Sequence, residues 1–330
     1  MLNTDLKLNE KILTDAPDLA ATRDGYGEGL VVLGEKNPNV VVLCADLTES
    51  TKSDKFAEIY PERFFEMGVA EQNMAAVAAG LAVSGKVAFI SSYATFSPGK
   101  NWETIRTTTV YNNANVKIAG HHAGIMTGPD GATHQATEDI AITRAWPKMV
   151  VIVPCDSIEA KKATIAAGNY VGPVYLRFTR DKSTVITSEE TPFEIGKASV
   201  LFKTDTPQVT IFGTGYLLQN ALLAASELEK EGIKTEVVNI STIKPLDEGT
   251  VLASLKQTGA AVTVEDHQVE GGLGGAIAEF SAKNIPVPIE FIGLQNTFAE
   301  SGKPVELIEK YGLSKNAIKE AVKKVVARKK

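Results

Sequence analysis

The sequence predicts an α/β protein with two doubly wound domains, for three reasons. Its 330 residues suffice for two domains that each bury a core. Short Val- and Ile-rich runs recur at residues 40–43, 87–90, 116–119, 150–153 and 174–178, and a second series follows at 209–212, 236–239, 261–265 and 290–292. Helix-length segments separate these runs, and apolar runs without polar alternation are typical of parallel strands covered on both faces.

In chain order, we expect a lead-in over residues 1–20 that packs on a partner, followed by a helix from Arg23 to about Gly34. The first domain spans 21–182, with a mostly parallel sheet. Residues 183–198 lie in a polar stretch without strong periodicity and form an interdomain linker. The smaller second domain spans 199–330. Its helices are expected near residues 217–231, 247–257 and 273–283.

Composition indicates an ordinary globular chain without affinity for nucleic acid or membrane. The formal net charge is −6, whereas binding to phosphate backbones needs clustered Lys and Arg. The apolar runs are shorter than a membrane span, and the first residues lack the pattern of a secretory signal. Cys44 and Cys155 each lie beside a Val-rich run, which indicates two buried thiols in a protein of a reducing compartment. We therefore expect a cytoplasmic protein.

The most informative stretch runs from Phe64 to Asn73 and leads into an Ala-rich, nearly uncharged helix. Glu71 opens this helix. Because burial disfavours the charged form of an acid, we expect its pKa to be raised, so that the carboxyl can share a proton with a ring nitrogen. The alternative interpretation is a carboxylate that only complements the positive end of the helix dipole.

This stretch resembles the pyrimidine-binding segment of thiamine-diphosphate enzymes, and of transketolases in particular. The resemblance covers the chain from about Ala21 onward. It implies that Glu71, in Ala-Glu-Gln-Asn, holds the aminopyrimidine nitrogen N1′ of thiamine diphosphate and favours its imino tautomer. The cofactor can then deprotonate its own thiazolium carbon.

A second stretch, from Ser92 to Phe96, follows an apolar strand, where ligands usually bind. Aromatic residues there most often belong to the core. The resemblance instead implies that Phe96 stacks on the aminopyrimidine, with Tyr93 as its neighbour. The chain departs from the family over Ser97 to Glu103, where transketolases carry further aromatics and an Arg-Ala-Phe-Asp-Gln run.

Three of the four histidines fall in the glycine-rich loop 120–135. Imidazole and carboxylate groups could bind zinc, but the spacing fixes no ligand geometry, which favours recognition of a polar substrate. The loop resembles the transketolase substrate loop. The resemblance implies that His122 binds the sugar phosphate, Asp130 reads the donor's hydroxyl stereochemistry, and His134 bonds the substrate hydroxyls and the intermediate.

By the same resemblance, Arg23, Ser50 and Arg180 match phosphate binders, and arginine's planar fork fits a phosphate. Asp46 matches the aspartate that approaches the cofactor across the dimer interface. The alternatives are surface ion pairs for the arginines and a helix N-cap for Ser50, ahead of a helix over 51–59. In the second domain we assign no catalytic role, and expect His267 to be structural or at an interface.

The chain has no Gly-Asp-Gly motif, with which the family binds Mg²⁺ and the cofactor diphosphate. The resemblance therefore implies a split transketolase of the pentose phosphate pathway. A separate N-terminal subunit would carry the Mg²⁺ and diphosphate site, in an α2β2 heterotetramer. The enzyme would transfer a ketol unit from xylulose 5-phosphate to ribose 5-phosphate or a similar aldose phosphate. The alternatives are the β subunit of a 2-oxo-acid dehydrogenase and a noncatalytic binding module of the same fold.

Overall fold

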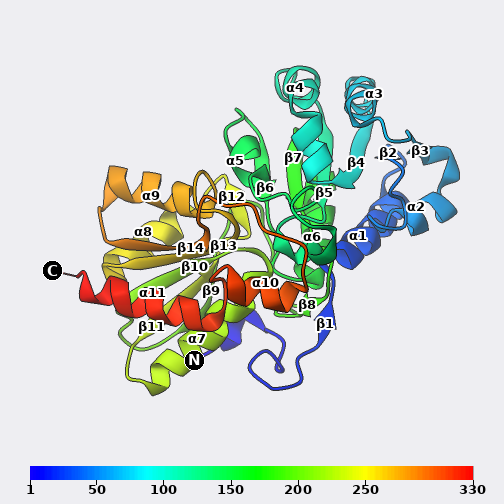
Figure 1. Ribbon diagram of the computed structural model, residues 1–330. Coiled ribbons are helices and arrows are strands. Elements are labelled where there is room, and N and C mark those ends of the chain that lie inside the picture. The colour runs from blue at the N-terminus through cyan, green and yellow to red at the C-terminus, as the bar shows by residue number, and fades with distance from the viewer. Residues whose placement is uncertain (330) are drawn as a thin grey trace.

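Two sheets, one in each lobe of the molecule, organise the chain in the computed structural model, which describes residues 1–329 (Figure 1). The seven-stranded sheet has the order β12 (Thr242–Lys244), β6 (Val150–Ile152), β7 (Val174–Arg177), β5 (Val116–His121), β4 (Val87–Tyr93), β2 (Val40–Cys44) and β3 (Phe64–Glu66). The five-stranded sheet has the order β14 (Ile289–Leu294), β13 (Ala261–Gln268), β10 (Val209–Gly213), β11 (Thr235–Asn239) and β9 (Ser199–Lys203). All pairings are parallel except those of the edge strands β12 and β9. The predicted fold class is confirmed.

Helices cover both faces of the first sheet. They are α1 (Thr22–Lys36), α2 (Asp54–Ile59), α3 (Glu71–Val83), α4 (Trp102–Thr104), α5 (Asp139–Arg144) and α6 (Ser157–Asn169). The irregular turns η3 (Thr95–Lys100) and η4 (Ile105–Val110) flank α4. Helices α1 and α6 pack so closely that a Cβ at Gly25 would lie 1.8 Å from the Ser157 carbonyl oxygen. Only glycine permits this approach.

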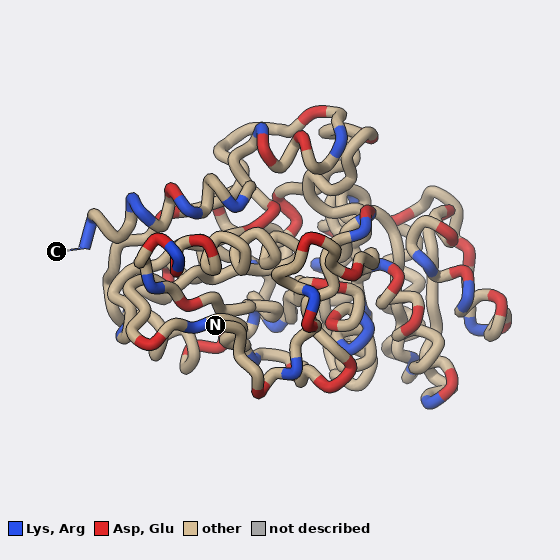
Figure 2. The backbone as a smooth tube through the Cα atoms, turned by 90° about the horizontal axis from the view of Figure 1, so that it is seen from below, with Lys and Arg blue, Asp and Glu red and all other residues tan. Residues whose placement is uncertain are grey.

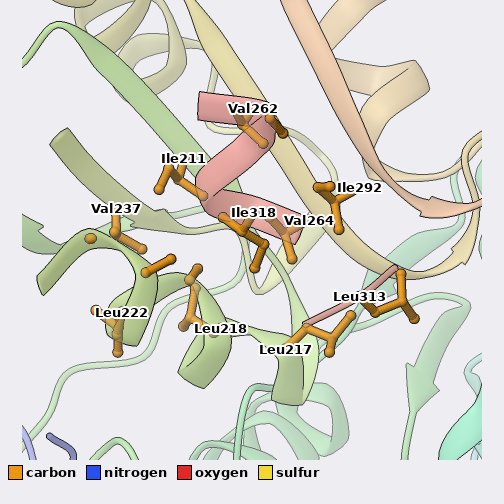
Figure 3. Close-up of a cluster of buried hydrophobic side chains, with 14 of the residues drawn as sticks. Ile211, Leu217, Leu218, Leu222, Val237, Val262, Val264, Ile292, Leu313 and Ile318 are labelled. Atoms are coloured by element: carbon orange, nitrogen blue, oxygen red, sulfur yellow. The ribbon is translucent and has the colours of Figure 1, made fainter. Parts of the chain in front are cut away.

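The second lobe contains α7 (Leu218–Lys230), α8 (Glu248–Thr258), α9 (Leu273–Asn284), α10 (Pro304–Lys310) and α11 (Lys315–Ala327). Its core lies between one face of the sheet and helices α7 and α11 (Figure 3). The labelled side chains there are Ile211, Leu217, Leu218, Leu222, Val237, Val262, Val264, Ile292, Leu313 and Ile318. Burying each such side chain contributes roughly 1.5–3 kcal/mol. Helix α11 carries several lysines and one acidic residue, Glu320 (Figure 2). Lys319 forms ion pairs with Glu227 of α7 and with Glu231, which follows the end of α7.

Much of the lead-in, which we expected to pack on a partner, packs on this chain's own second lobe. Ile12 is fully buried in the core of that lobe, and Leu2, Leu6 and Leu8 pack against it. Asn3 N–H also bonds the Leu201 carbonyl at 2.8 Å. Several apolar side chains of the lead-in are therefore buried within the chain, whereas Met1 and Leu19 are exposed.

One short strand crosses between the lobes, and another pairs the linker with the lead-in. Strand β12 follows the second lobe's β11 in sequence but pairs antiparallel with β6 of the first sheet. In the predicted linker, β8 (Ser183–Thr184) pairs with β1 (Leu19–Ala20). Cys44 and Cys155 are buried and unpaired, as predicted. Within residues 1–329, no helix has both the length and the apolar character needed to cross a membrane.

Candidate active site

The carboxyl ends of the parallel strands meet at one edge of the seven-stranded sheet, and the predicted site residues follow them there. Strand β2 leads to Asp46, β3 to Glu71, β4 to Phe96, β5 to His122 and β7 to Arg180. Ligands of open α/β sheets usually bind at this edge. Residues from five separate stretches of the sequence therefore lie at one edge of the sheet.

Glu71 is the first residue of α3, and only 2% of its side chain is exposed. Its Oε2 accepts a 2.7 Å hydrogen bond from Lys100 Nζ. Asn101 Nδ2 donates to the Glu71 carbonyl oxygen at 3.0 Å. The carboxyl is buried, as expected, but its ammonium partner comes from the segment in which the chain departs from the family pattern, and sequence reasoning missed it.

An aromatic cluster lies at the ends of β4 and β5. The Tyr93 ring stacks on His122, with centroids 3.9 Å apart and planes at 20°, and lies nearly parallel to Phe96 at 6.0 Å. His134 meets Phe96 edge-on, at 5.4 Å and 81°. Because Phe96 and Lys100 belong to the same turn η3, the cluster adjoins the Glu71 carboxylate. The arrangement offers flat apolar surface beside a buried acid.

His122 is held as a neutral imidazole. Burial lowers its pKa to about 3, and the charges of Arg23 and Arg180 act in the same direction. Its backbone has φ 52°, a left-handed conformation that costs roughly 1–3 kcal/mol, and Thr127 Oγ1 donates to its carbonyl oxygen at 2.5 Å. Among the described residues, Nδ1 has no hydrogen-bond partner. His122 can therefore meet an anion as a hydrogen-bond donor, not as a cation.

The remaining loop residues form a polar rim. Arg180 Nη1 donates to Asp130 Oδ1 at 3.1 Å and to the Thr127 carbonyl at 2.9 Å. Both side chains are about one-third exposed, so the pair remains open to solvent. His134 Nδ1 bonds Thr133 Oγ1 at 2.9 Å. Its Nε2 is then the ring nitrogen available to a substrate.

Arg23 and Ser50 are brought together, although through the backbone of Ser50. Arg23 Nη1 donates to the Ser50 carbonyl at 2.9 Å. The N-cap interpretation of Ser50 is wrong, because α2 begins at Asp54 with Ser53 in the N-cap position. Arg23 and Arg180 line a pocket of about 480 Å³, together with Ala21, Asp24, Lys52, Asp181 and Lys182. Four basic and two acidic side chains give this pocket a positive balance, which suits an anion.

Glu66 is a further residue that sequence reasoning did not assign. It ends β3, and Oε1 accepts hydrogen bonds from the backbone N–H groups of Asp46 at 2.7 Å and Gly68 at 3.0 Å. Its Oε2 accepts from Thr48 Oγ1 at 2.9 Å. Glu66 therefore fixes the loop that presents Asp46 and the turn that leads into Glu71. It lies within the motif stretch, five residues before Glu71, which is the signal that could have identified it.

A buried polar network joins the two lobes beneath the substrate loop. Arg177 donates to Asp139 from Nε, at 2.8 Å to Oδ2, and to the Asp266 carbonyl from Nη2, at 2.8 Å. Asp266 Oδ1 in turn accepts the Ile125 N–H at 3.0 Å. His267 Nε2 accepts the Ala141 N–H at 3.3 Å, which fits the interface role expected for it. The second lobe thus anchors the glycine-rich loop.

The geometry gives no support to the metal interpretation of that loop. Within residues 1–329, no three His, Cys, Asp or Glu side chains are grouped as metal ligands would be. His121, beside His122, points into the core, where its ring lies 4.8 Å from Tyr26 and 5.0 Å from Phe178. Burial lowers the pKa of His121 well below its usual value.

Comparison with known proteins assigns a family to both lobes. Residues 18–184 match the transketolase pyrimidine-binding domain, and residues 196–318 match the transketolase C-terminal domain. The putative transketolase C-terminal section of Methanocaldococcus jannaschii is 48% identical over 90% of this chain and 93% of its own length. The 6-deoxy-6-sulfo-D-fructose transketolase subunit SqwH of a Clostridium species is 40% identical, over 93% of this chain and 95% of its own length.

Longer relatives and solved structures agree with this assignment. Human transketolase is 35% identical over 94% of this chain, which spans only 50% of the human protein. A solved structure, described as a split gene transketolase in an inactive beta4 tetramer, superposes with a TM-score of 0.88 at 44% identity. It covers 94% of this chain and 99% of its own. This chain therefore belongs to the transketolase family and comprises the family's pyrimidine-binding and C-terminal domains.

Proposed function

We propose that this chain is the C-terminal subunit of a split transketolase. With a partner that carries the diphosphate-binding domain, it transfers a two-carbon ketol unit from a ketose phosphate such as xylulose 5-phosphate to an aldose phosphate such as ribose 5-phosphate. The observation that carries the proposal is the buried carboxylate of Glu71 beside the stacked rings of Tyr93 and Phe96, at the ligand edge of the sheet. The 93% and 95% coverage of two relatives named as a transketolase section and subunit supports the split arrangement.

The residues present fit the aminopyrimidine of thiamine diphosphate. In the stretch that carries Phe96, the buried side-chain oxygens of Ser92, Thr95 and Asn101 have no hydrogen-bond partner among the described residues, and Asn101 also bonds the Glu71 carbonyl, so a polar heterocycle bound there could satisfy them. Phe96 would stack on the ring, with Tyr93 behind it, and the carboxyl of Glu71 would share a proton with N1′. When bound, the cofactor supplies the nucleophilic carbon that carries the ketol unit.

This chain's loops would hold the sugar phosphate. Arg23 and Arg180 line the basic pocket, the Ser50 carbonyl accepts a hydrogen bond from Arg23, and neutral His122 adds an uncharged donor. Asp130 would read the donor hydroxyls, and its exposed pair with Arg180 can open to admit substrate. His134 would move a proton at the substrate hydroxyl through Nε2, since Thr133 holds Nδ1.

The partner would bind Mg²⁺ and the diphosphate, because this chain lacks the Gly-Asp-Gly motif. Glu66 holds the backbone of Asp46 at the sheet edge by accepting its N–H, and the Asp46 side chain would approach the cofactor across the interface. We propose an α2β2 assembly, since closed symmetry would complete two equivalent sites. The two unpaired buried thiols support a reducing compartment, and we place the enzyme in the cytoplasm and in the pentose phosphate pathway.

A second candidate donor is a sulfonated ketose. The 40% identical relative is named for 6-deoxy-6-sulfo-D-fructose, and a pocket lined by four basic side chains suits a sulfonate as well as a phosphate. The comparisons favour transketolase chemistry over the 2-oxo-acid dehydrogenase alternative, because both family matches are to transketolase domains.

The experiment is ketol transfer to ribose 5-phosphate with thiamine diphosphate and Mg²⁺. This chain, the partner and their mixture are each assayed with xylulose 5-phosphate and with 6-deoxy-6-sulfofructose. We expect activity only in the mixture and at least a hundredfold loss in Glu71→Ala, with Glu62→Ala as control because Glu62 is 71% exposed. Activity that survives Glu71→Ala would contradict the catalytic assignment. Decarboxylation of pyruvate by the mixture would instead support the dehydrogenase alternative.

A further inference from the structure

The Glu71 carboxylate already has a partner in this chain. Lys100 Nζ lies 2.7 Å from Glu71 Oε2, whereas Oε1 accepts no hydrogen bond from the described residues. A buried carboxylate without a counter-charge is costly, by several kcal/mol per ion. In the cofactor-free chain, Lys100 therefore supplies the counter-charge of the buried Glu71 carboxyl group.

The carboxyl group is also nearly covered. Only 2% of the Glu71 side chain is exposed, so a ring needs a neighbouring group to move before it can pack against the carboxylate. The Lys100 side chain is 44% exposed. Its ammonium can return to water when the ring replaces it as the partner of the carboxylate, because the Lys100 side chain is already partly solvated. Lys100 is thus the covering group that moves most easily.

Movement of Lys100 is coupled to the aromatic ring of the site. Phe96 and Lys100 belong to the same six-residue turn η3, which leaves helical geometry at Ser97 (φ −137°, ψ 100°). Asn101 ties the end of this turn to α3, since Nδ2 bonds both the Glu71 carbonyl at 3.0 Å and Ser97 Oγ at 3.2 Å. A shift of the turn would uncover the carboxylate and reposition the Phe96 ring together.

We propose that Lys100 is a latch on Glu71. In the cofactor-free chain its ammonium holds one oxygen of the carboxylate to which the aminopyrimidine ring would bind, and binding requires the segment 95–101 to release it. This inference rests on the proposed function, because it takes Glu71 as the residue that holds the cofactor. Lys100 acts through Glu71 and does not itself touch substrate.

The test measures cofactor binding, not turnover. Thiamine diphosphate is titrated into the assembled two-chain protein with Mg²⁺, and tryptophan fluorescence gives the Kd and association rate. Trp102, two residues after Lys100, stacks on Trp146 at 5.5 Å and reports movement of the segment. Lys100→Met removes the competing charge and leaves Glu71 without a partner, so we expect about fivefold tighter and faster binding.

Matched variants separate the outcomes. Lys86→Met removes another exposed-loop lysine that bonds only Asn39 and should leave binding unchanged. Lys100→Arg keeps a cation on Glu71 and should retain the wild-type Kd; Lys100→Gln replaces Lys100→Met if that variant does not fold. Unchanged or weaker binding in Lys100→Met would overturn the latch while leaving the proposed function intact. Absence of cofactor binding by the wild-type mixture would overturn both.

Discussion

Glu159, on α6 between the two lobes, makes the stability of this chain depend on pH. Burial, followed by the nearby Asp156 charge, raises its pKa to about 7. Its Oε2 accepts the Cys155 N–H at 2.7 Å, and Oε1 lies 2.9 Å from Asn239 Nδ2. Asn239 Oδ1 has no partner among the described residues. With the amide turned over, that oxygen accepts the proton of a neutral Glu159, so the site suits the protonated acid.

The direction of this pH dependence follows from the number of protons that the folded and unfolded chains bind. An unfolded glutamate titrates near 4.5, so between pH 4.5 and 7 the unfolded chain has released a proton that the folded chain retains. The free energy of unfolding therefore falls as pH rises through this window. Over about 2.5 pH units the loss is roughly 3 kcal/mol, at 1.36 kcal/mol per unit. Glu159→Gln removes this contribution, since its amide can donate to Asn239 Oδ1 while its oxygen accepts the Cys155 N–H.

Urea unfolding at pH 5, 6, 7 and 8 tests this reasoning, followed by fluorescence and circular dichroism so that coincident curves establish a single transition. We expect Glu159→Gln to gain about 3 kcal/mol relative to wild type between pH 5 and 8. Glu279→Gln, in which an exposed carboxylate is replaced, should keep the wild-type slope. Equal pH slopes in wild type and Glu159→Gln would refute the assignment of a neutral buried acid.

Two further predictions concern the lobe interface and the substrate loop. Asp139→Asn breaks the ion pair with Arg177, in which the Asp139 side chain is 1% exposed and the Arg177 side chain 3%. It should lower the free energy of unfolding by about 3–5 kcal/mol in urea titrations. A loss below about 1 kcal/mol would show that this pair does not stabilise the fold. His122→Gln should raise the KM for the phosphate donor roughly fivefold without altering the pH profile between pH 5 and 8, because the imidazole is neutral throughout. A titration step in the pH profile between pH 5 and 8 that wild type shows and His122→Gln lacks would contradict a neutral imidazole.

The strands that sequence patterns predicted best are those buried on both faces. Strand β2 was predicted at 40–43 and lies at Val40–Cys44, all of it buried. The antiparallel edge strands β9 and β12 were missed. Each is only partly buried, and β12 pairs with a strand about 90 residues earlier in the chain. A short segment carries no local signal for such a distant pairing, because the contact is set by how the lobes dock.

For the candidate site, sequence could predict which residues share an edge, since the carboxyl ends of parallel strands meet there. It could not predict which side chains touch. The Lys100 contact joins residues 29 positions apart, and the pairing of Arg180 with Asp130 joins residues 50 positions apart. Both depend on loop conformations that no periodicity specifies, such as the left-handed backbone at His122.

The contact between the lobes gives a physical reason why the two domains stay in one chain. Asp266, from the second domain, accepts the Ile125 N–H in the loop that carries His122 and Asp130. The approach is so close that a Cβ at Gly124 would lie 2.0 Å from Asp266 Oδ2, so the loop needs glycine there. Relatives of similar length in Methanocaldococcus jannaschii and Clostridium likewise match across both domains. Separating the domains would therefore expose Arg177 and Asp266 together and release the glycine-rich loop.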